Sequence, residues 1–302
     1  MINKIFQNLW KTEDDNMRIG ISGTEWVVSR YSGDHIREIT CHAERLGISF
    51  LELWVPHNFK KEETEEVKRK LDELDMKAIC ISTPSGLNRP TDYNGVKRNQ
   101  DLILHSIEVA TRLGAETVNT YFGPNPARSE AEAIKTYVEN IKPCLKAAED
   151  NSIVITIENE FDPTGSDVTR RADGCLKLLR AVNSDCFLLN FDACNFYVAG
   201  EEPYPYAYLL LKDYVKYIHL KDAAKYDSQL YGERGELFRD KGGISIPVSL
   251  GEGGVNYEAY LEALKKDGYT GYLVLEPHFP LSQLKDEYEK ALNYLKAKGI
   301  WK

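Results

Sequence analysis

Four hydrophobic runs in the second half of the chain each end in a side chain that can bind a divalent metal ion. The terminal residues are Glu158, Asp192, His219 and Glu276. A single glutamate at a strand end is often only a helix cap or a solvated group, but four candidates at four successive run ends do not fit that explanation. Three carboxylates and one imidazole suit a six-coordinate ion, with Mn²⁺ as the first choice and Co²⁺ or Mg²⁺ as alternatives. Zn²⁺ more often takes nitrogen and sulfur ligands, although this set does not forbid it.

These runs belong to a longer alternation of strand-like and helix-like segments. The predicted strands are residues 18–22, 50–54, 77–82, 117–121, 153–158, 186–192, 215–220 and 271–276. The predicted helices between them include residues 62–75, 99–113 and 130–149. Strands that are apolar on both faces indicate parallel βαβ units. Eight such units predict an α/β fold, a (β/α)₈ TIM barrel in one domain over residues 18–302, with residues 1–17 as an N-terminal extension. A doubly wound open sheet is the alternative, but no Gly-x-Gly-x-x-Gly follows the first strand.

The amino-acid composition and charge of the chain limit the kinds of molecule that it is expected to bind. The 302 residues carry a formal net charge of −9, which argues against a nucleic-acid binder with a basic face. The six cysteines have no Cys-x-x-Cys spacing and are expected to be reduced. We expect no membrane association, because no apolar run approaches the ~20 residues that span a bilayer. The N-terminus lacks a signal-peptide pattern, so a cytoplasmic location is predicted.

An unusually long interval, residues 222–256, separates the seventh predicted strand from the eighth. A long loop after a strand lies on the face where barrel enzymes bind substrate, so we predict a lid or specificity loop. An irregular, solvated excursion is the alternative. Arg234 within this interval is a candidate clamp for a phosphate or carboxylate, or else an ordinary surface charge.

Five short motifs at the ends of the predicted strands resemble those of the xylose-isomerase-like TIM-barrel superfamily, which includes sugar-phosphate isomerases and epimerases, ketose 3-epimerases and inosose dehydratase. The motifs are Ile157-Glu158-Asn159, Asn190-Phe191-Asp192, Ile218-His219-Leu220-Lys221-Asp222, Leu250-Gly251-Glu252-Gly253-Gly254-Val255-Asn256 and Leu275-Glu276-Pro277. Their order and approximate spacing agree from Met17 to the C-terminus. The resemblance implies that Glu158, Asp192, His219 and Glu276 are the metal ligands and that the enzyme is a homo-oligomer.

The resemblance also implies that Glu158 and Glu276 exchange protons with a small-molecule sugar. Removing a proton next to a carbonyl gives an enediolate, whose charge a metal ion can stabilise, and a positioned carboxylate can act as base and then as acid. We therefore expect a sugar or sugar-phosphate isomerase or epimerase. The alternative is a lyase or dehydratase that acts on a keto-sugar or keto-glycoside, either alone or together with a partner subunit. A metal-dependent phosphodiesterase of the AP-endonuclease type is less favoured, because such sites need many histidines.

Further candidates for binding the substrate lie near the same strand ends. Ketose epimerases often have a histidine three residues after the aspartate of the sixth strand, and here Asn195 stands in that place. Lys221 follows His219 by two residues, and His278 follows Glu276 by two. Trp54 ends the second predicted strand and could stack on a sugar, although core packing is the default for such a residue.

Overall fold

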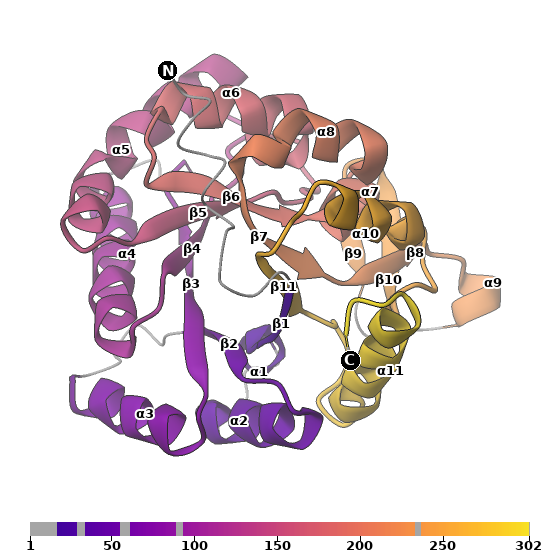
Figure 1. The fold of residues 1–302 in the computed structure, drawn as a ribbon. Helices are drawn as coiled ribbons and strands as arrows, with labels where there is room; N and C mark the ends of the chain where they lie inside the picture. Colours follow the sequence, from indigo (N-terminus) through magenta and orange to yellow (C-terminus); the bar gives the residue numbers. More distant parts are fainter. Residues whose placement is uncertain (1–16, 29–33, 55–60, 89–92, 233–236, 302) are drawn as a thin grey trace.

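Eight parallel strands form a closed barrel in the computed structural model, which describes residues 17–28, 34–54, 61–88, 93–232 and 237–301 (Figure 1). Around the barrel the strand order is β1-β11-β7-β6-β5-β4-β3-β2. The barrel strands are β1 (Arg18–Ser22), β2 (Phe50–Trp54), β3 (Lys77–Gly86), β4 (Thr117–Tyr121), β5 (Val154–Glu158), β6 (Phe187–Asp192), β7 (Val215–Leu220) and β11 (Tyr272–Leu275). Because β1 pairs with both β2 and β11, the sheet has no open edge. The predicted TIM barrel is confirmed, and the open doubly wound sheet is excluded.

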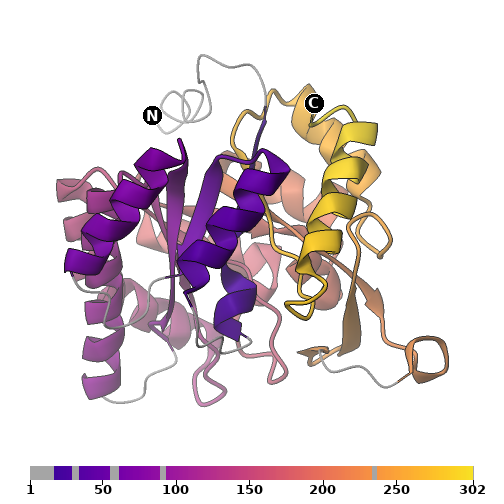
Figure 2. The ribbon, with the colours of Figure 1, turned by 90° about the horizontal axis from the view of Figure 1, so that it is seen from below.

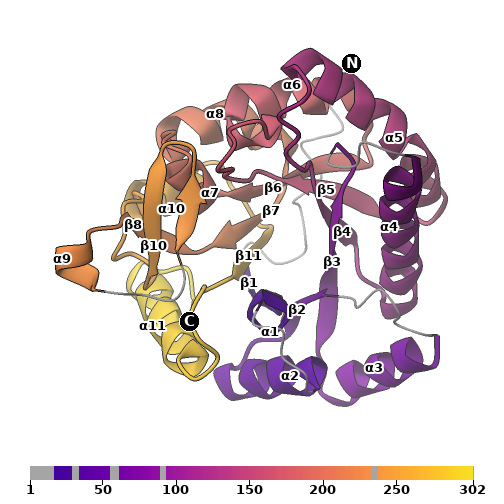
Figure 3. The same cartoon turned by 180° about the vertical axis from the view of Figure 1, so that it is seen from behind.

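Helices surround the barrel (Figures 1 and 3). The longer ones are α2 (His35–Leu46), α3 (Lys61–Glu73), α4 (Tyr93–Leu113), α5 (Glu130–Asp150), α6 (Ala172–Val182), α10 (Tyr257–Lys266) and α11 (Leu284–Ala297). Shorter helical segments are α1 (Thr24–Val28), α7 (Ala193–Val198), α8 (Tyr208–Leu211) and α9 (Ser228–Tyr231), together with Val168–Arg170, Pro203–Ala207 and Lys212–Tyr214. None of the helices in the described ranges is long and apolar enough to cross a membrane.

Local signals in the sequence explain several helix boundaries. The Ser129 hydroxyl accepts from the backbone of Glu132, whose carboxylate accepts in return from the backbone of Ser129, so α5 begins with a capping box. Helix α2 begins after Asp34, whose side chain accepts from Arg37 N, and ends at Gly47 with a φ of +69°. The three predicted helices match α3, α4 and α5, although α4 begins six residues earlier than expected, at Tyr93.

The strands pack on the helices on one side and on each other inside the barrel. Most of the core lies between strands and helices. A second, smaller cluster is formed by Ile79, Cys80, Tyr217, Tyr272 and Val274. Alternate residues of a strand share a face, so Tyr217 and Val274 lie on the same inward face as His219 and Glu276. This inner cluster is therefore an apolar floor beneath the carboxyl ends of the strands.

The long interval 222–256 contains a separate three-stranded antiparallel sheet. Its order is β8 (Asp222–Lys225), β10 (Gly243–Val248) and β9 (Phe238–Asp240). Figure 2 shows it projecting from the barrel on the side where the barrel strands end. A bidentate contact fixes it, because Arg170 Nε and Nη2 donate to the two Asp240 oxygens at 2.6 and 2.5 Å. The described part is thus regular structure anchored to the barrel and not an irregular excursion, while a role as a lid stays a prediction. Arg234, and all of the predicted N-terminal extension except Met17, lie outside the described residues.

Candidate metal and substrate site

The four predicted metal ligands converge at the carboxyl ends of adjacent strands. The barrel register places Asp192 beside His219 and Glu158 beside Asn190, and Glu276 N donates to Leu220 O just beyond β11. All four predicted ligands are buried, and one ligand atom from each lies within 4.8 Å of the others. Parallel strands with a common direction bring their ends to one face, which is why residues spread over 118 positions meet here.

The imidazole of His219 has two different environments at its two nitrogens. Nδ1 faces the other three candidates, at 3.2 Å from Glu158 Oε1, 3.3 Å from Glu276 Oε2 and 4.0 Å from Asp192 Oδ2. Nε2 lies 2.7 Å from Glu52 Oε2 on β2. Burial lowers the pKa of His219, but Glu276, Glu52 and Glu158 together raise it well above its ordinary value. Nδ1 is therefore the nitrogen that points toward the centre of the cluster.

Lys221 places a positive charge against the same carboxylates. Its Nζ lies 2.7 Å from Glu276 Oε2 and 2.8 Å from Asp192 Oδ2, with Glu158 Oε1 at 4.0 Å. Burial lowers the pKa of Lys221, but these carboxylates raise it well above its usual range, so the ammonium is charged. For Glu276, burial raises the pKa, and His219 and Lys221 then bring it well below the ordinary value.

The residues present fit a divalent cation. Asp192 Oδ2 is buried and accepts no hydrogen bond, although Lys221 Nζ is near it, so a lone pair is directed into the cluster. Burial raises the pKa of Asp192, and although Lys221 lowers it, the charges of Glu158 and Glu276 raise it further. Oxygen donors with one imidazole are the ligands that Mn²⁺, Co²⁺ and Zn²⁺ accept. The cluster could therefore hold such an ion.

Three asparagine side chains hold Glu158. Asn119 Nδ2 and Asn190 Nδ2 donate to Glu158 Oε2 at 2.9 and 3.1 Å, and Asn195 Nδ2 lies 3.3 Å from Glu158 Oε1. Asn195 also donates to Asn159 O at 2.9 Å and is almost fully buried. Its observed contacts therefore orient Glu158, whereas our sequence-based interpretation assigned it to substrate binding. Asn190 was missed in the sequence, although it precedes Asp192 by two residues and so shares its face.

A glycine-rich turn fixes the backbone just after Lys221. The carboxylate of Asp222 accepts from the backbone N–H of Gly251, Gly253 and Val255 at 3.1, 3.0 and 3.3 Å. A Cβ on Gly253 would lie 2.1 Å from Asp222 Oδ1, so only glycine allows this approach. The Gly251-Glu252-Gly253-Gly254 motif thus ties the last barrel unit to the end of β7.

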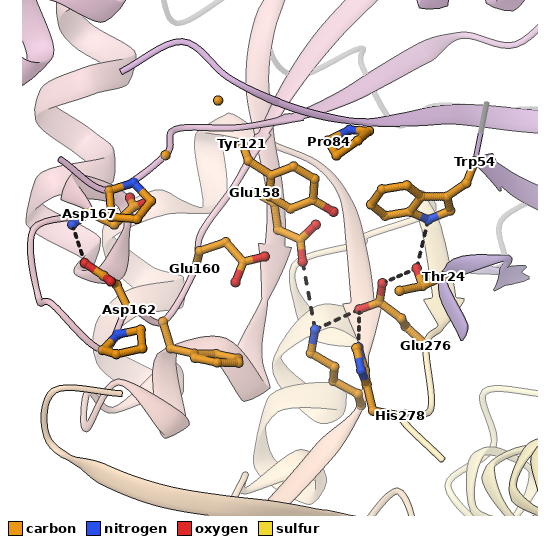
Figure 4. A pocket seen from close by; sticks show the side chains of 16 residues that line it. Thr24, Trp54, Pro84, Tyr121, Glu158, Glu160, Asp162, Asp167, Glu276 and His278 are labelled. Atoms are coloured by element: carbon orange, nitrogen blue, oxygen red, sulfur yellow. Dashed lines mark hydrogen bonds and ion pairs between the residues drawn. The ribbon is translucent and has the colours of Figure 1, made fainter. Parts of the chain in front are cut away.

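A pocket of about 380 Å³ opens above the cluster, large enough for a sugar-sized molecule. Its lining includes Glu158, Glu276 and Lys221. Trp54 and Tyr121 form an aromatic wall, with ring centroids 6.1 Å apart and planes 23° from parallel (Figure 4). Trp54 Nε1 donates to Thr24 Oγ1, and Thr24 donates to Glu276 Oε1 at 2.6 Å. Trp54 thus lines the pocket, and its role in stacking on a sugar stays a prediction.

Further acidic residues belong to the described lining. Glu160, Asp162 and Asp167 line the side of the pocket opposite Trp54 (Figure 4). Burial, and then the charge of Glu158, raises the pKa of Glu160 well above its usual value. His278 also lines the pocket, with Nδ1 3.1 Å from Glu25 Oε1 and Nε2 3.6 Å from Glu276 Oε2.

The sequence matches a known protein family along most of its length. Residues 42–298 match the family described as xylose isomerase-like TIM barrel. The chain belongs to this family. No protein with a curated description matches the sequence.

Solved structures with the same fold include a D-allulose 3-epimerase and a probable dehydratase. The IolI protein with a bound zinc atom has a TM-score of 0.75 and 15% identity, over 95% of this chain and 99% of that one. D-allulose 3-epimerase from Methylomonas sp. in complex with D-allulose has a TM-score of 0.72 and 19% identity, over 96% and 99%. The probable 3-DHS dehydratase from Bacillus anthracis has a TM-score of 0.72 and 16% identity, over 92% and 99%. At these identities the likeness establishes the fold shared by epimerases and a dehydratase.

Proposed function

We propose that this member of the xylose isomerase-like TIM barrel family is a divalent-metal-dependent isomerase or epimerase that removes a proton next to the carbonyl of a sugar. The observation that carries the proposal is the buried cluster of Glu158, Asp192, His219 and Glu276 at the base of a sugar-sized pocket. These four residues would hold the ion, with Mn²⁺ as the first choice. When bound, the ion would act as a Lewis acid toward the negative charge that develops on the substrate oxygen.

The protein's own groups would perform the proton transfers. Glu158 and Glu276 both line the pocket, so each can reach a substrate carbon. One carboxylate takes the proton to give an enediolate, and a carboxyl group returns a proton either to the same carbon or to its neighbour. Return to the same carbon from the opposite face inverts it, and return to the neighbour isomerises an aldose and a ketose. The amides on Glu158 and the Thr24 hydroxyl on Glu276 would fix the two carboxylates during these steps.

A dehydratase or lyase is the second candidate, because the same enediolate can expel a leaving group from the next carbon. Glu160 supports this alternative, because burial and the charge of Glu158 raise its pKa well above the usual value, which favours a carboxyl group that could donate to a departing hydroxyl. The residues of the pocket argue against a phosphodiesterase of the AP-endonuclease type, because such sites need many histidines. In the described lining His278 is the only histidine, and the remaining charged groups are mostly carboxylates.

The charge of the lining supports an uncharged substrate rather than a sugar phosphate. Within the described part of the pocket the basic residues are Lys221 and His278, and both already contact carboxylates. In the described lining a phosphate dianion would meet Glu160, Asp162 and Asp167 and no arginine. The aromatic wall of Trp54 and Tyr121 suits the apolar face of a sugar ring.

Proton–deuterium exchange followed by NMR tests the proposal. Protein stripped of metal and reloaded with Mn²⁺, Mg²⁺ or Zn²⁺ is incubated in D₂O with neutral ketoses, keto-glycosides and their phosphates, and the metal is removed before spectra are recorded. Metal-dependent deuterium at the carbon next to the carbonyl is expected, and it should disappear in Glu158→Gln and Glu276→Gln. Glu287→Gln is the matched control, because Glu287 is a buried carboxylate on α11 that hydrogen-bonds Ser249 away from the pocket.

The products decide between the two candidates: an inverted or isomerised sugar indicates an isomerase or epimerase, and a dehydrated product a lyase. If the protein binds metal but no substrate in the panel exchanges a proton for deuterium, the enolisation proposal is overturned. Exchange confined to phosphorylated ketoses would overturn the inference of a neutral substrate. Three further predictions remain: a homo-oligomeric state, a partner subunit and a cytoplasmic location. Light scattering after size-exclusion chromatography can measure the oligomeric state.

A further inference from the structure

Glu52 is a buried carboxylate that the sequence-based reasoning did not single out. It lies in the middle of β2, in the run Phe50-Leu51-Glu52-Leu53-Trp54, with no exposed surface. Alternation along the strand places Glu52 on the same face as Trp54, inside the barrel. An isolated carboxylate in such a place would cost several kcal/mol, so its partners should explain why it is there.

Each oxygen of Glu52 has its own partners. Oε1 accepts from the hydroxyls of Ser82 and Ser22 at 2.8 and 3.1 Å. Oε2 lies 2.7 Å from His219 Nε2. Ser22 in turn contacts Thr24 Oγ1 at 2.7 Å, and Thr24 donates to Glu276. The two serines therefore fix the carboxylate so that one oxygen is directed at the imidazole.

A histidine that binds a metal ion through one nitrogen must carry its hydrogen on the other. A carboxylate on the second nitrogen selects that tautomer, fixes the ring plane and makes the ligating nitrogen more basic. In His219 the nitrogen facing Glu52 is Nε2, and Nδ1 is left facing Glu158, Glu276 and Asp192. A half-turn of the ring would place Cδ2–H, which cannot bind a metal ion, where Nδ1 now faces the cluster.

We propose that Glu52 is the positioning residue of the metal centre, accepting the Nε2–H of His219 so that the Nδ1 lone pair faces the metal. This role rests on the proposed function, because it presumes that the cluster binds a metal ion. Glu52 does not reach the pocket and is absent from its lining in the described residues. It acts on the ion only through His219.

Glu52→Gln is the decisive variant, because glutamine has the same shape but only one acceptor oxygen. If that oxygen stays with Ser22 and Ser82, the amide NH₂ faces His219 Nε2 and forces the hydrogen onto Nδ1, where it blocks the ion. If the amide turns over, the serines must reverse their hydrogen bonds. Either arrangement is expected to weaken the binding of Mn²⁺ and Zn²⁺ about 10- to 100-fold, as loss of such a partner generally does.

Two control variants separate this role from packing. Ser82→Ala removes one donor to Glu52 but keeps the contact with the imidazole, and we expect it to change the metal dissociation constant less than about threefold. Glu287→Gln replaces a different buried, serine-bonded glutamate and should leave that constant unchanged. Dissociation constants are measured by titration calorimetry against a competing chelator, and circular dichroism checks the fold of each variant.

A spectroscopic measurement tests the tautomer directly. In Zn²⁺-loaded protein labelled with ¹⁵N-histidine, long-range ¹H–¹⁵N spectra show which nitrogen carries the hydrogen. We expect His219 to show a slowly exchanging Nε2–H and a metal-bound Nδ1. A metal-bound Nε2 in the wild-type protein overturns the proposal even if Glu52→Gln fails to fold, and so does a folded Glu52→Gln that binds Zn²⁺ as tightly as the wild type. Failure of the wild-type protein to bind any divalent ion would instead refute the proposed function.

Discussion

Replacing Lys221 by methionine should destabilise the metal-free protein more than the metal-loaded protein. The ammonium lies 2.7 Å from Glu276 and 2.8 Å from Asp192, and it is 6% exposed. Methionine has a similar length and volume but no charge, so the variant leaves these carboxylates buried without their ammonium partner. Removing one partner of a buried ion pair costs about 3–5 kcal/mol. We therefore expect a loss of that size in the free energy of unfolding when EDTA is present.

A divalent ion should recover part of this loss. The ion and the Lys221 ammonium are attracted by the same carboxylates and repel each other, so removal of the ammonium should tighten Mn²⁺ binding. Tenfold tighter binding corresponds to about 1.4 kcal/mol. Because a ligand that binds only the native state adds its binding free energy to stability, the deficit of the variant should be about 1.4 kcal/mol smaller in saturating Mn²⁺ than in EDTA.

Urea denaturation followed by circular dichroism, with EDTA or with Mn²⁺, measures both quantities. Lys216→Met is the matched control: Lys216 pairs with Glu116 at 2.9 Å, but Glu116 is half exposed, so the loss should be below about 1 kcal/mol and independent of metal. The reasoning is refuted if Lys221→Met costs less than about 1 kcal/mol in EDTA, or if its deficit is the same with and without Mn²⁺.

Two further predictions concern residues around the site. Gly253→Ala should lower the melting temperature by several degrees in differential scanning fluorimetry, because its Cβ would lie 2.1 Å from Asp222 Oδ1; an unchanged temperature would show that the turn can move at no cost. Burial raises the pKa of Asp167 to about 6, above its ordinary 3.8, so the folded protein binds this proton more tightly than the unfolded chain. The stability that results is present below about pH 4 and is lost as pH rises through 6. Asp167→Asn, which stays neutral, should therefore gain about 1.4 kcal/mol relative to the wild type between pH 5 and pH 7.5 in urea titrations, and a pH-independent difference would contradict the raised pKa.

The sequence predicted the barrel well because the signals involved are local. Short apolar runs alternating with amphipathic segments indicate βαβ units, and such units close in only a few ways. All eight predicted strands are present: four have the predicted bounds, and three differ by one residue at one or both ends. The exception is β3, which extends to Gly86 because it pairs with Tyr121 of β4 after a register shift, a contact between strands that no local pattern contains.

The convergence of Glu158, Asp192, His219 and Glu276 was also predictable. A residue at the carboxyl end of a strand must lie at one face of a parallel barrel whatever the rest of the chain does. Strand alternation then predicts that His278 and Lys221 lie near their neighbours two residues earlier, and both line the pocket. Asn195 is buried and contacts Glu158 and Asn159, and its predicted role in substrate binding stays a prediction.

What a side chain contacts across the barrel was decided only by the tertiary structure. Glu52 and His219 are 167 positions apart, and their contact depends on the stagger of the strands and on the shift in register between β2 and β3 at Leu51 and Glu52. The small sheet within the interval 222–256 contacts Arg170, far away in sequence, through Asp240. The sequence by itself determined which groups reach the active face, since strand direction and period are local properties. The packing of distant strands determined which of these groups hold one another in place, since that depends on distances that only the closed barrel sets.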